Sequence, residues 1–185
     1  MMQELSMNIL DVAENSVRAG ACLVEIAVDE SPQADLLSVT VSDNGCGMTP
    51  EQVKNVTDPF YTTRSTRKVG LGVPFFKMAA ELTGGKLEIQ STVGKGTILK
   101  ADFVRSSIDL MPLGDINETI CTLIHCNPNI DFLYTRRFES AEMKLDTREF
   151  RRILDGIELN DPKVSKFIRE YLAENTYDLL AGHMA

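Results

Sequence analysis

The stretch that decides the fold is Leu10-Asp11-Val12-Ala13-Glu14-Asn15-Ser16-Val17-Arg18-Ala19-Gly20, within a predicted helix from Gln3 to Gly20. At 100° per residue, small and apolar side chains fall on one side of this helix. Asp11, Asn15 and Arg18 share a narrow arc on the opposite side. An amide oxygen suits a hard cation such as Mg²⁺, and a neighbouring carboxylate suits orientation or deprotonation of a nucleophile. A merely solvated helix face is the alternative, because charged stripes are common on surface helices.

A glycine-rich turn ends the second of two predicted strands, at Asp43-Asn44-Gly45-Cys46-Gly47-Met48. A carboxylate at a strand end can accept a hydrogen bond from an exocyclic amine, such as the amino group of adenine. Gly45 and Gly47 allow the backbone to approach a flat ring and to adopt positive φ. The alternative for this segment is an ordinary tight turn.

A third motif, Gly70-Leu71-Gly72, precedes a predicted helix. Backbone N–H groups at a helix N-terminus form an anion site, helped by the helix dipole. Arg64, Arg67 and Lys68 lie just before the motif, and three cations suit the charge of a triphosphate. The P-loop pattern is absent and the third glycine of a Rossmann turn is missing, so neither of those phosphate loops is predicted.

In this order and spacing, the motifs resemble the ATP-binding domain of the GHKL superfamily, which includes gyrase-type topoisomerases, chaperone ATPases, sensor histidine kinases and MutL-type mismatch-repair proteins. The matching segments are the N-box at residues 10–21, the G1 box at 43–48, the F-box of sensor kinases at 58–64, the G2 box at 70–73 and the closing Gly-x-Gly-Thr at 94–97. The resemblance covers residues 1–105. It implies an α+β fold, a two-layer α/β sandwich (the Bergerat fold) with helices on one face of a mixed sheet.

The resemblance also implies a role for each matching position. Asn15 would be the Mg²⁺ ligand, and Asp43 would bind the adenine of ATP. Asp11 stands where the ATPases carry their catalytic Glu, and residues 60–69 would form a lid over ATP. The other implied nucleotide contacts are Arg18, Gly45, Gly47, Arg64, Lys68, Gly70, Leu71, Gly72 and Thr97.

Asp11 also marks a conflict between the branches of this superfamily. Sensor kinases commonly carry an amide at this place, whereas an acid favours ATP hydrolysis or Ser/Thr phosphorylation, as in anti-sigma-factor kinases. The F-box and the G2 spacing favour the sensor kinases instead. Three hypotheses therefore stay open: a stand-alone kinase-like protein acting on a partner protein, a non-kinase ATPase or nucleotide-dependent switch, and a domain that has lost ATP.

Composition and histidine content limit the partners, the cellular location and the phospho-acceptor that we expect. The chain has 185 residues and a formal charge of −8, which argues against a protein that coats nucleic acid or an anionic membrane. With no predicted membrane span or signal peptide and four unpatterned cysteines, we expect a cytoplasmic protein with reduced thiols. Since the N-box begins so early, no phospho-acceptor hairpin fits before it, and His125 and His183 both follow the domain. We therefore expect the acceptor on another chain.

Residues 106–185 match no motif. Their pattern predicts a helix, two short strands and two further helices, the last over 162–173. We expect a small C-terminal α/β domain of unknown role that docks on the ATP module or recognises a partner. Cys121, His125 and Cys126 lack a fourth ligand and zinc-knuckle spacing, so no zinc site is predicted. The oligomeric state stays open.

Overall fold

A computed structural model describes residues 4–58 and 72–182 of the chain. The elements are α1 Leu5–Arg18, β1 Leu23–Ser31, β2 Leu36–Asp43, α2 Pro50–Asn55, α3 Gly72–Leu82, β3 Lys86–Thr92, β4 Gly96–Val104, α4 Ile116–Cys126, β5 Asp131–Phe138, β6 Ala141–Asp146, α5 Thr147–Leu154 and α6 Pro162–Ala181. These match the helices and strands predicted from the sequence to within a few residues. The exception is α6, which continues past its predicted end at Ala173 to Ala181.

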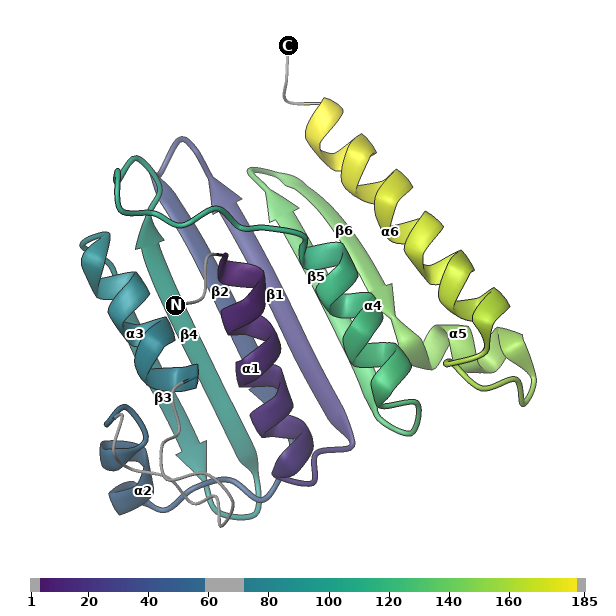
Figure 1. Cartoon of the computed structure of the whole chain (residues 1–185), viewed down its shortest axis with the longest axis horizontal. Coiled ribbons are helices and arrows are strands. Elements are labelled where there is room, and N and C mark those ends of the chain that lie inside the picture. Colours follow the sequence, from purple (N-terminus) through teal and green to yellow (C-terminus); the bar gives the residue numbers. More distant parts are fainter. Residues whose placement is uncertain (1–3, 59–71, 183–185) are drawn as a thin grey trace.

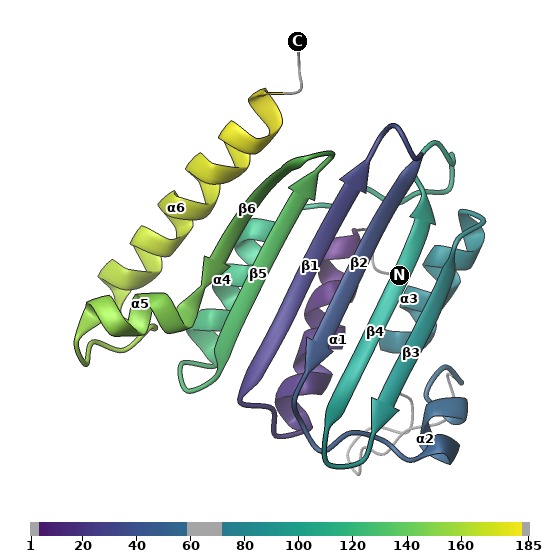
Figure 2. The same ribbon diagram turned by 180° about the vertical axis from the view of Figure 1, so that it is seen from behind.

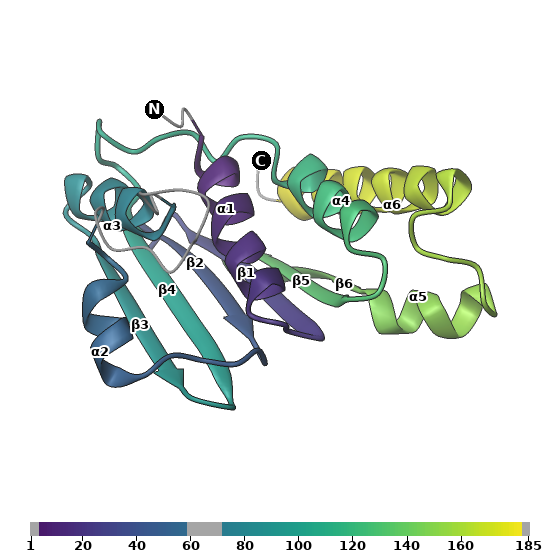
Figure 3. The ribbon, with the colours of Figure 1, turned by 60° about the horizontal axis from the view of Figure 1, so that its bottom comes forward.

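The strands form one six-stranded sheet in the order β3-β4-β2-β1-β5-β6. Neighbouring strands are antiparallel except for β1 and β5, which are parallel. The helices α1, α3, α4 and α6 lie on one face of this sheet, as Figures 1 and 2 show from the two sides, and Figure 3 shows the two layers edge-on. The predicted mixed sheet with helices on one face is therefore confirmed.

Side chains alternate along the central strands, so that every second residue faces the helix layer. Val24, Ile26 and Val28 of β1 are buried on that face. Phe132 and Tyr134 of β5 pair in register with Val24 and Ile26 and are buried beside them. One hydrophobic core thus runs beneath all four covering helices.

The separate small domain expected for residues 106–185 is not what the structure shows, because β5 and β6 continue the sheet of the N-terminal half. In addition, α4 packs on α1, and the segment before α4 caps α1. The N–H groups of Leu5 and Ser6 donate to the carbonyl oxygens of Pro112 and Leu113 at 3.0 and 2.8 Å. These bonds satisfy N-terminal donors that have no side-chain cap in the described part of the chain. A functional division at residue 105 stays a prediction.

Candidate functional site

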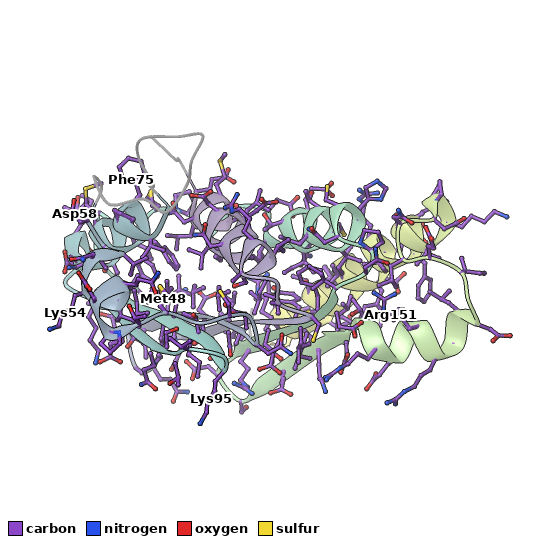
Figure 4. All side chains as sticks on the ribbon, turned by 90° about the horizontal axis from the view of Figure 1, so that it is seen from below. Met48, Lys54, Asp58, Phe75, Lys95 and Arg151 are labelled. Atoms are coloured by element: carbon purple, nitrogen blue, oxygen red, sulfur yellow. The ribbon has the colours of Figure 1, made fainter. Side chains whose placement is uncertain are left out.

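Three segments meet at one end of the sheet, at the bottom of Figure 1: the end of α1, the end of β2 and the β3–β4 turn, while the start of α3 lies higher, beside the middle of α1. Three of the predicted motifs lie on these segments. Figure 4 views the molecule from this end, with Met48, Lys54 and Asp58 on the α2 side, Lys95 at the β3–β4 turn and Arg151 of α5 on the far side.

The carboxylate of Asp43 is held at the end of β2 by two donors. The hydroxyl of Ser16 in α1 donates to Asp43 Oδ2 at 2.7 Å, and the backbone N–H of Gly45 donates to Oδ1 at 2.9 Å. Thr97 is the residue paired with Asp43 across the β2–β4 ladder. A carboxylate oxygen can accept more than one hydrogen bond, so Asp43 retains capacity for an exocyclic amine.

Two glycines let the G1 loop lie directly on the β3–β4 turn. Gly47 has φ +66°, and a Cβ there would overlap the carbonyl oxygen of Thr92. Gly96 has φ +108°, and a Cβ there would overlap the carbonyl oxygen of Asp43. Both positions therefore require glycine on two grounds, the backbone conformation and the missing space. A hollow of about 240 Å³ beside this contact is lined by Ser42, Asp43, Gln90, Ser91, Thr92, Lys95, Gly96, Thr97 and Ile98.

Ser91 is a site residue that sequence reasoning missed. Its hydroxyl accepts from the N–H of Met48 at 2.8 Å and lies 2.8 Å from the Thr97 hydroxyl and 3.0 Å from the Gly96 carbonyl oxygen. It thus joins the last residue of the G1 box to the closing Gly-x-Gly-Thr. The sequence predicts a hairpin of two strands, Lys86–Ser91 and Thr97–Phe103, and a polar residue directly opposite Thr97 in that hairpin was the available signal. Ser16, a polar residue on the apolar face of α1, carried a similar signal.

Asn44 ties the same loop to the start of β1. Its Oδ1 accepts hydrogen bonds from the N–H groups of Cys22 and Leu23, both at 3.0 Å, and its Nδ2 lies 3.0 Å from Cys22 Sγ. These bonds anchor the residue that follows Asp43. The position of the Asp43 carboxylate is therefore set from three directions: the helix α1, the loop itself and the start of β1.

The proposed metal ligand and its helical neighbour are in direct contact. Arg18 Nη2 donates to Asn15 Oδ1 at 2.8 Å, and Arg18 Nη1 lies 3.5 Å from Glu14 Oε2. The Arg18 side chain is 45% exposed, so this arrangement is free to rearrange in solvent. The predicted stripe of Asp11, Asn15 and Arg18 is thus present on one side of α1.

Asp11 meets the start of α3. A Cβ on Gly72 would overlap Asp11 Oδ2, so the carboxylate lies directly against the first residue of that helix. A helix N-terminus carries partial positive charge, which favours a carboxylate there. The structure therefore brings the N-box to the last residue of the predicted Gly-x-Gly. Arg64, Lys68, Gly70 and Leu71, with the predicted lid, lie outside the described residues.

The ligand that the family resemblance assigns to a metal ion is a single amide oxygen, that of Asn15. Over residues 4–58 and 72–182, no group of three or more His, Cys, Asp or Glu side chains is placed to hold a metal ion. Burial raises the pKa of the Cys121 thiol to about 11, which disfavours the thiolate that zinc requires. Asn15 offers one amide oxygen, as suits an ion that keeps several water ligands.

The mixed sheet covered by helices on one face, with the N-box helix and the G1 loop at one end, is the architecture of a Bergerat-type nucleotide-binding fold. The model of the "histidine kinase-, DNA gyrase B-, and HSP90-like ATPase" family matches residues 1–106. The chain belongs to this family. Its ATP-binding domain is similar to the catalytic domains of sensor kinases.

Two curated relatives illustrate this similarity. A putative sensor protein from Shewanella frigidimarina is 31% identical over 109 residues, which are 58% of this chain and 17% of that protein. Sensor protein SrrB from Staphylococcus aureus is 34% identical over 101 residues, 52% of this chain and 17% of that protein. The chain thus spans about a sixth of the length of these relatives.

One solved structure extends the likeness beyond the family segment. The N-terminal domain of a DNA repair protein aligns with a TM-score of 0.56 and 15% identity over 78% of this chain and 52% of that one. At this identity the likeness concerns the fold alone. Among the described helices, none has both the length and the apolar character that crossing a membrane requires.

Proposed function

We propose that this chain is a Mg²⁺-ATP-binding, kinase-like regulatory protein that transfers the γ-phosphate to a residue on a partner protein. The observation that supports it most directly is the contact between Asp11 and Gly72, since it puts an acid beside the helix start where the phosphates are expected. Asn15 lies one turn further along the same helix. The acid Asp11, the proposed metal ligand Asn15 and the anion site at the start of α3 are therefore close together.

Different residues would contact the adenine, the metal ion and the phosphates of the nucleotide. Asp43 accepts the adenine amino group, with Gly47 and Thr97 supporting the ring. Asn15 holds Mg²⁺, which on binding would neutralise charge on the phosphates. The phosphates themselves are contacted by Arg18, Arg64, Lys68, Gly70, Leu71 and Gly72.

Asp11 decides which acceptor fits best. A hydroxyl needs help to lose its proton, and a carboxylate within reach gives that help by accepting it. An imidazole acceptor needs no such base. Asp11 therefore favours a hydroxyl side chain of a partner protein, or water, as the acceptor.

A nucleotide-dependent switch without phosphotransfer is the second candidate. It is favoured by the way α1 carries site residues near one end and is capped by residues 112–113 at the other. A shift of α1 on nucleotide binding would be felt by α4, which packs against it. Residues 106–182 would then present the change to a cytoplasmic protein partner, with no nucleic acid or membrane involved.

Calorimetric titration with Mg²⁺-ATP tests the nucleotide site. We expect Asp43→Asn to weaken binding at least about tenfold, because the amide presents a donor where the adenine amine needs an acceptor. Asp109→Asn removes one charge from an exposed position of the chain and is the matched control. Equal affinity for wild type and Asp43→Asn would contradict the adenine role.

Radiolabelled γ-phosphate separates the two candidates. Wild type incubated with a cytoplasmic fraction is expected to label a partner protein, and Asp11→Asn is expected to bind ATP but lose most of that labelling. Binding without labelling or phosphate release would favour the switch instead.

A further inference from the structure

Asn8 is a buried polar residue of α1 whose side chain is 1% exposed. Within residues 4–58 and 72–182, neither its Nδ2 nor its Oδ1 has a hydrogen-bond partner. Leaving both atoms unpaired in the protein interior costs free energy that an apolar residue of the same size would not. Such a group in a folded protein calls for an explanation.

Asn8 lies on the same stripe of α1 as the site residues. Asp11 follows it by three positions and Asn15 by seven, so the three side chains lie along one side of the helix. Asp11 contacts Gly72, which shows that this side of α1 faces α3. Asn8 is therefore the deeper neighbour of Asp11, between α3 and the sheet.

Asp11 lies at the N-terminus of α3, where a phosphate of the nucleotide is expected to bind. Its carboxylate lies against the first residue of α3, where the helix dipole attracts an anion. Two anions at one helix start repel each other, and the phosphate carries the larger charge. When the phosphates arrive, the Asp11 carboxylate must turn away from Gly72.

We propose that Asn8 is a positioning residue that receives Asp11 in the nucleotide-bound state. Its Nδ2 then donates to the Asp11 carboxylate and holds it turned along α1, toward the acceptor. A carboxylate has room for several hydrogen bonds, so other contacts of Asp11 are compatible with this one. In the structure described, the Asp11 carboxylate lies against Gly72 instead. This inference rests on the proposed ATP site.

Replacing Asn8 with leucine separates this role from a structural one. Asn8→Leu keeps the branched shape and the number of heavy atoms and removes the unpaired amide, so we expect a higher melting temperature without nucleotide. Its Kd for Mg²⁺-ATP is expected to rise about fivefold, the worth of one buried hydrogen bond. Ile9→Val, in the adjacent fully buried position, is the control and should lower the melting temperature without changing the Kd.

A second measurement follows the side-chain amide of Asn8 directly by NMR. In wild type, the side-chain NH₂ signals of Asn8 should shift downfield and gain protection from exchange when Mg²⁺-ATP is added. An unchanged Kd for Asn8→Leu, a lower melting temperature of that variant or unmoved amide signals would each overturn the role of Asn8, while wild type still binds ATP. No binding by wild type would overturn the proposed function, and this inference with it.

Discussion

Arg18 donates a 2.8 Å hydrogen bond to the side-chain oxygen of Asn15, the atom that the family resemblance assigns to Mg²⁺. One oxygen cannot serve the guanidinium and a metal ion along the same direction. A metal ion at this oxygen would also repel the guanidinium, so we expect metal binding at Asn15 to turn Arg18 toward the phosphates, where its charge is also useful. The two events are coupled by this contact.

Arg18→Met tests the coupling. The change keeps an apolar stem but removes the donor, so metal binding no longer has to displace it. We expect the ratio of the ATP Kd in EDTA to that in Mg²⁺ to rise about two- to tenfold, measured by calorimetry. Glu14→Gln weakens the 3.5 Å ion pair but leaves the Asn15 bond, and should not change the ratio. A ratio that stays constant in Arg18→Met would show that the contact does not govern metal binding.

Gly72→Ala should be destabilising in a way that depends on Asp11. The added methyl group overlaps the Asp11 carboxylate, and we expect a loss of about 1–3 kcal/mol in the free energy of unfolding. In an Asp11→Ala background the overlap is gone, and alanine is the better helix former. Urea unfolding of the two single variants and the double variant measures the coupling. Additive effects would mean that the two side chains are not in contact.

Ser16→Ala should weaken both stability and nucleotide binding. It removes the 2.7 Å hydrogen bond to Asp43 Oδ2, a bond to a charged group in a half-buried setting. We expect a loss of about 1.5 kcal/mol in the free energy of unfolding and several-fold weaker ATP binding. Ser6→Ala, which loses a 3.3 Å bond to Glu4 at the far end of α1, is the control for affinity.

The pair Asp146–Arg148 should make stability depend on acid pH. Hydrogen bonds from the Arg148 side chain lower the pKa of Asp146, which is also the N-cap of α5. A lowered pKa stabilises the fold above the unfolded value near 4, and the contribution is lost as pH falls through the folded value.

Arg148→Met tests the direction in which this contribution to stability changes with pH. The difference in unfolding free energy between wild type and Arg148→Met should be largest at pH 7 and shrink below about pH 4. Arg152→Met changes an exposed arginine of the same helix and should give a difference that does not vary with pH. The opposite trend for Arg148→Met would refute the assignment.

The four cysteines should divide into two reactivity classes. Cys22, Cys46 and Cys126 are exposed, whereas Cys121 is buried and burial raises its pKa to about 11. An aromatic disulfide reagent is expected to titrate three thiols quickly and the fourth only on unfolding. Cys121→Ser should leave the fast phase unchanged. Four fast thiols would show that α4 does not shield Cys121.

Local patterns were sufficient for most elements. The sequence predicts β1 from its β-branched residues, β2 from its alternation, a helix start at Thr49-Pro50 and helix caps at Asp146 or Thr147 and at Asp161. These signals depend on residues a few positions apart, and the structure has the strands, the helix start and the caps at Asp146 and Asp161. The end of α6 was missed because its last two turns are polar on most sides. They form a helix nonetheless because Leu179 packs into the core.

The sequence by itself determined the chemistry available: an acid, an amide and an arginine on one helix, a carboxylate at a strand end, and glycines where the backbone must come close. Only the tertiary structure decided which of these meet. It set Asp11 on Gly72 and Arg18 on Asn15, and it buried Asn8 without a hydrogen-bond partner among the described residues. It also added β5 to β1 instead of forming a separate domain. Such contacts depend on how whole elements pack, and strand order and helix docking leave no local pattern in the residues that end up touching.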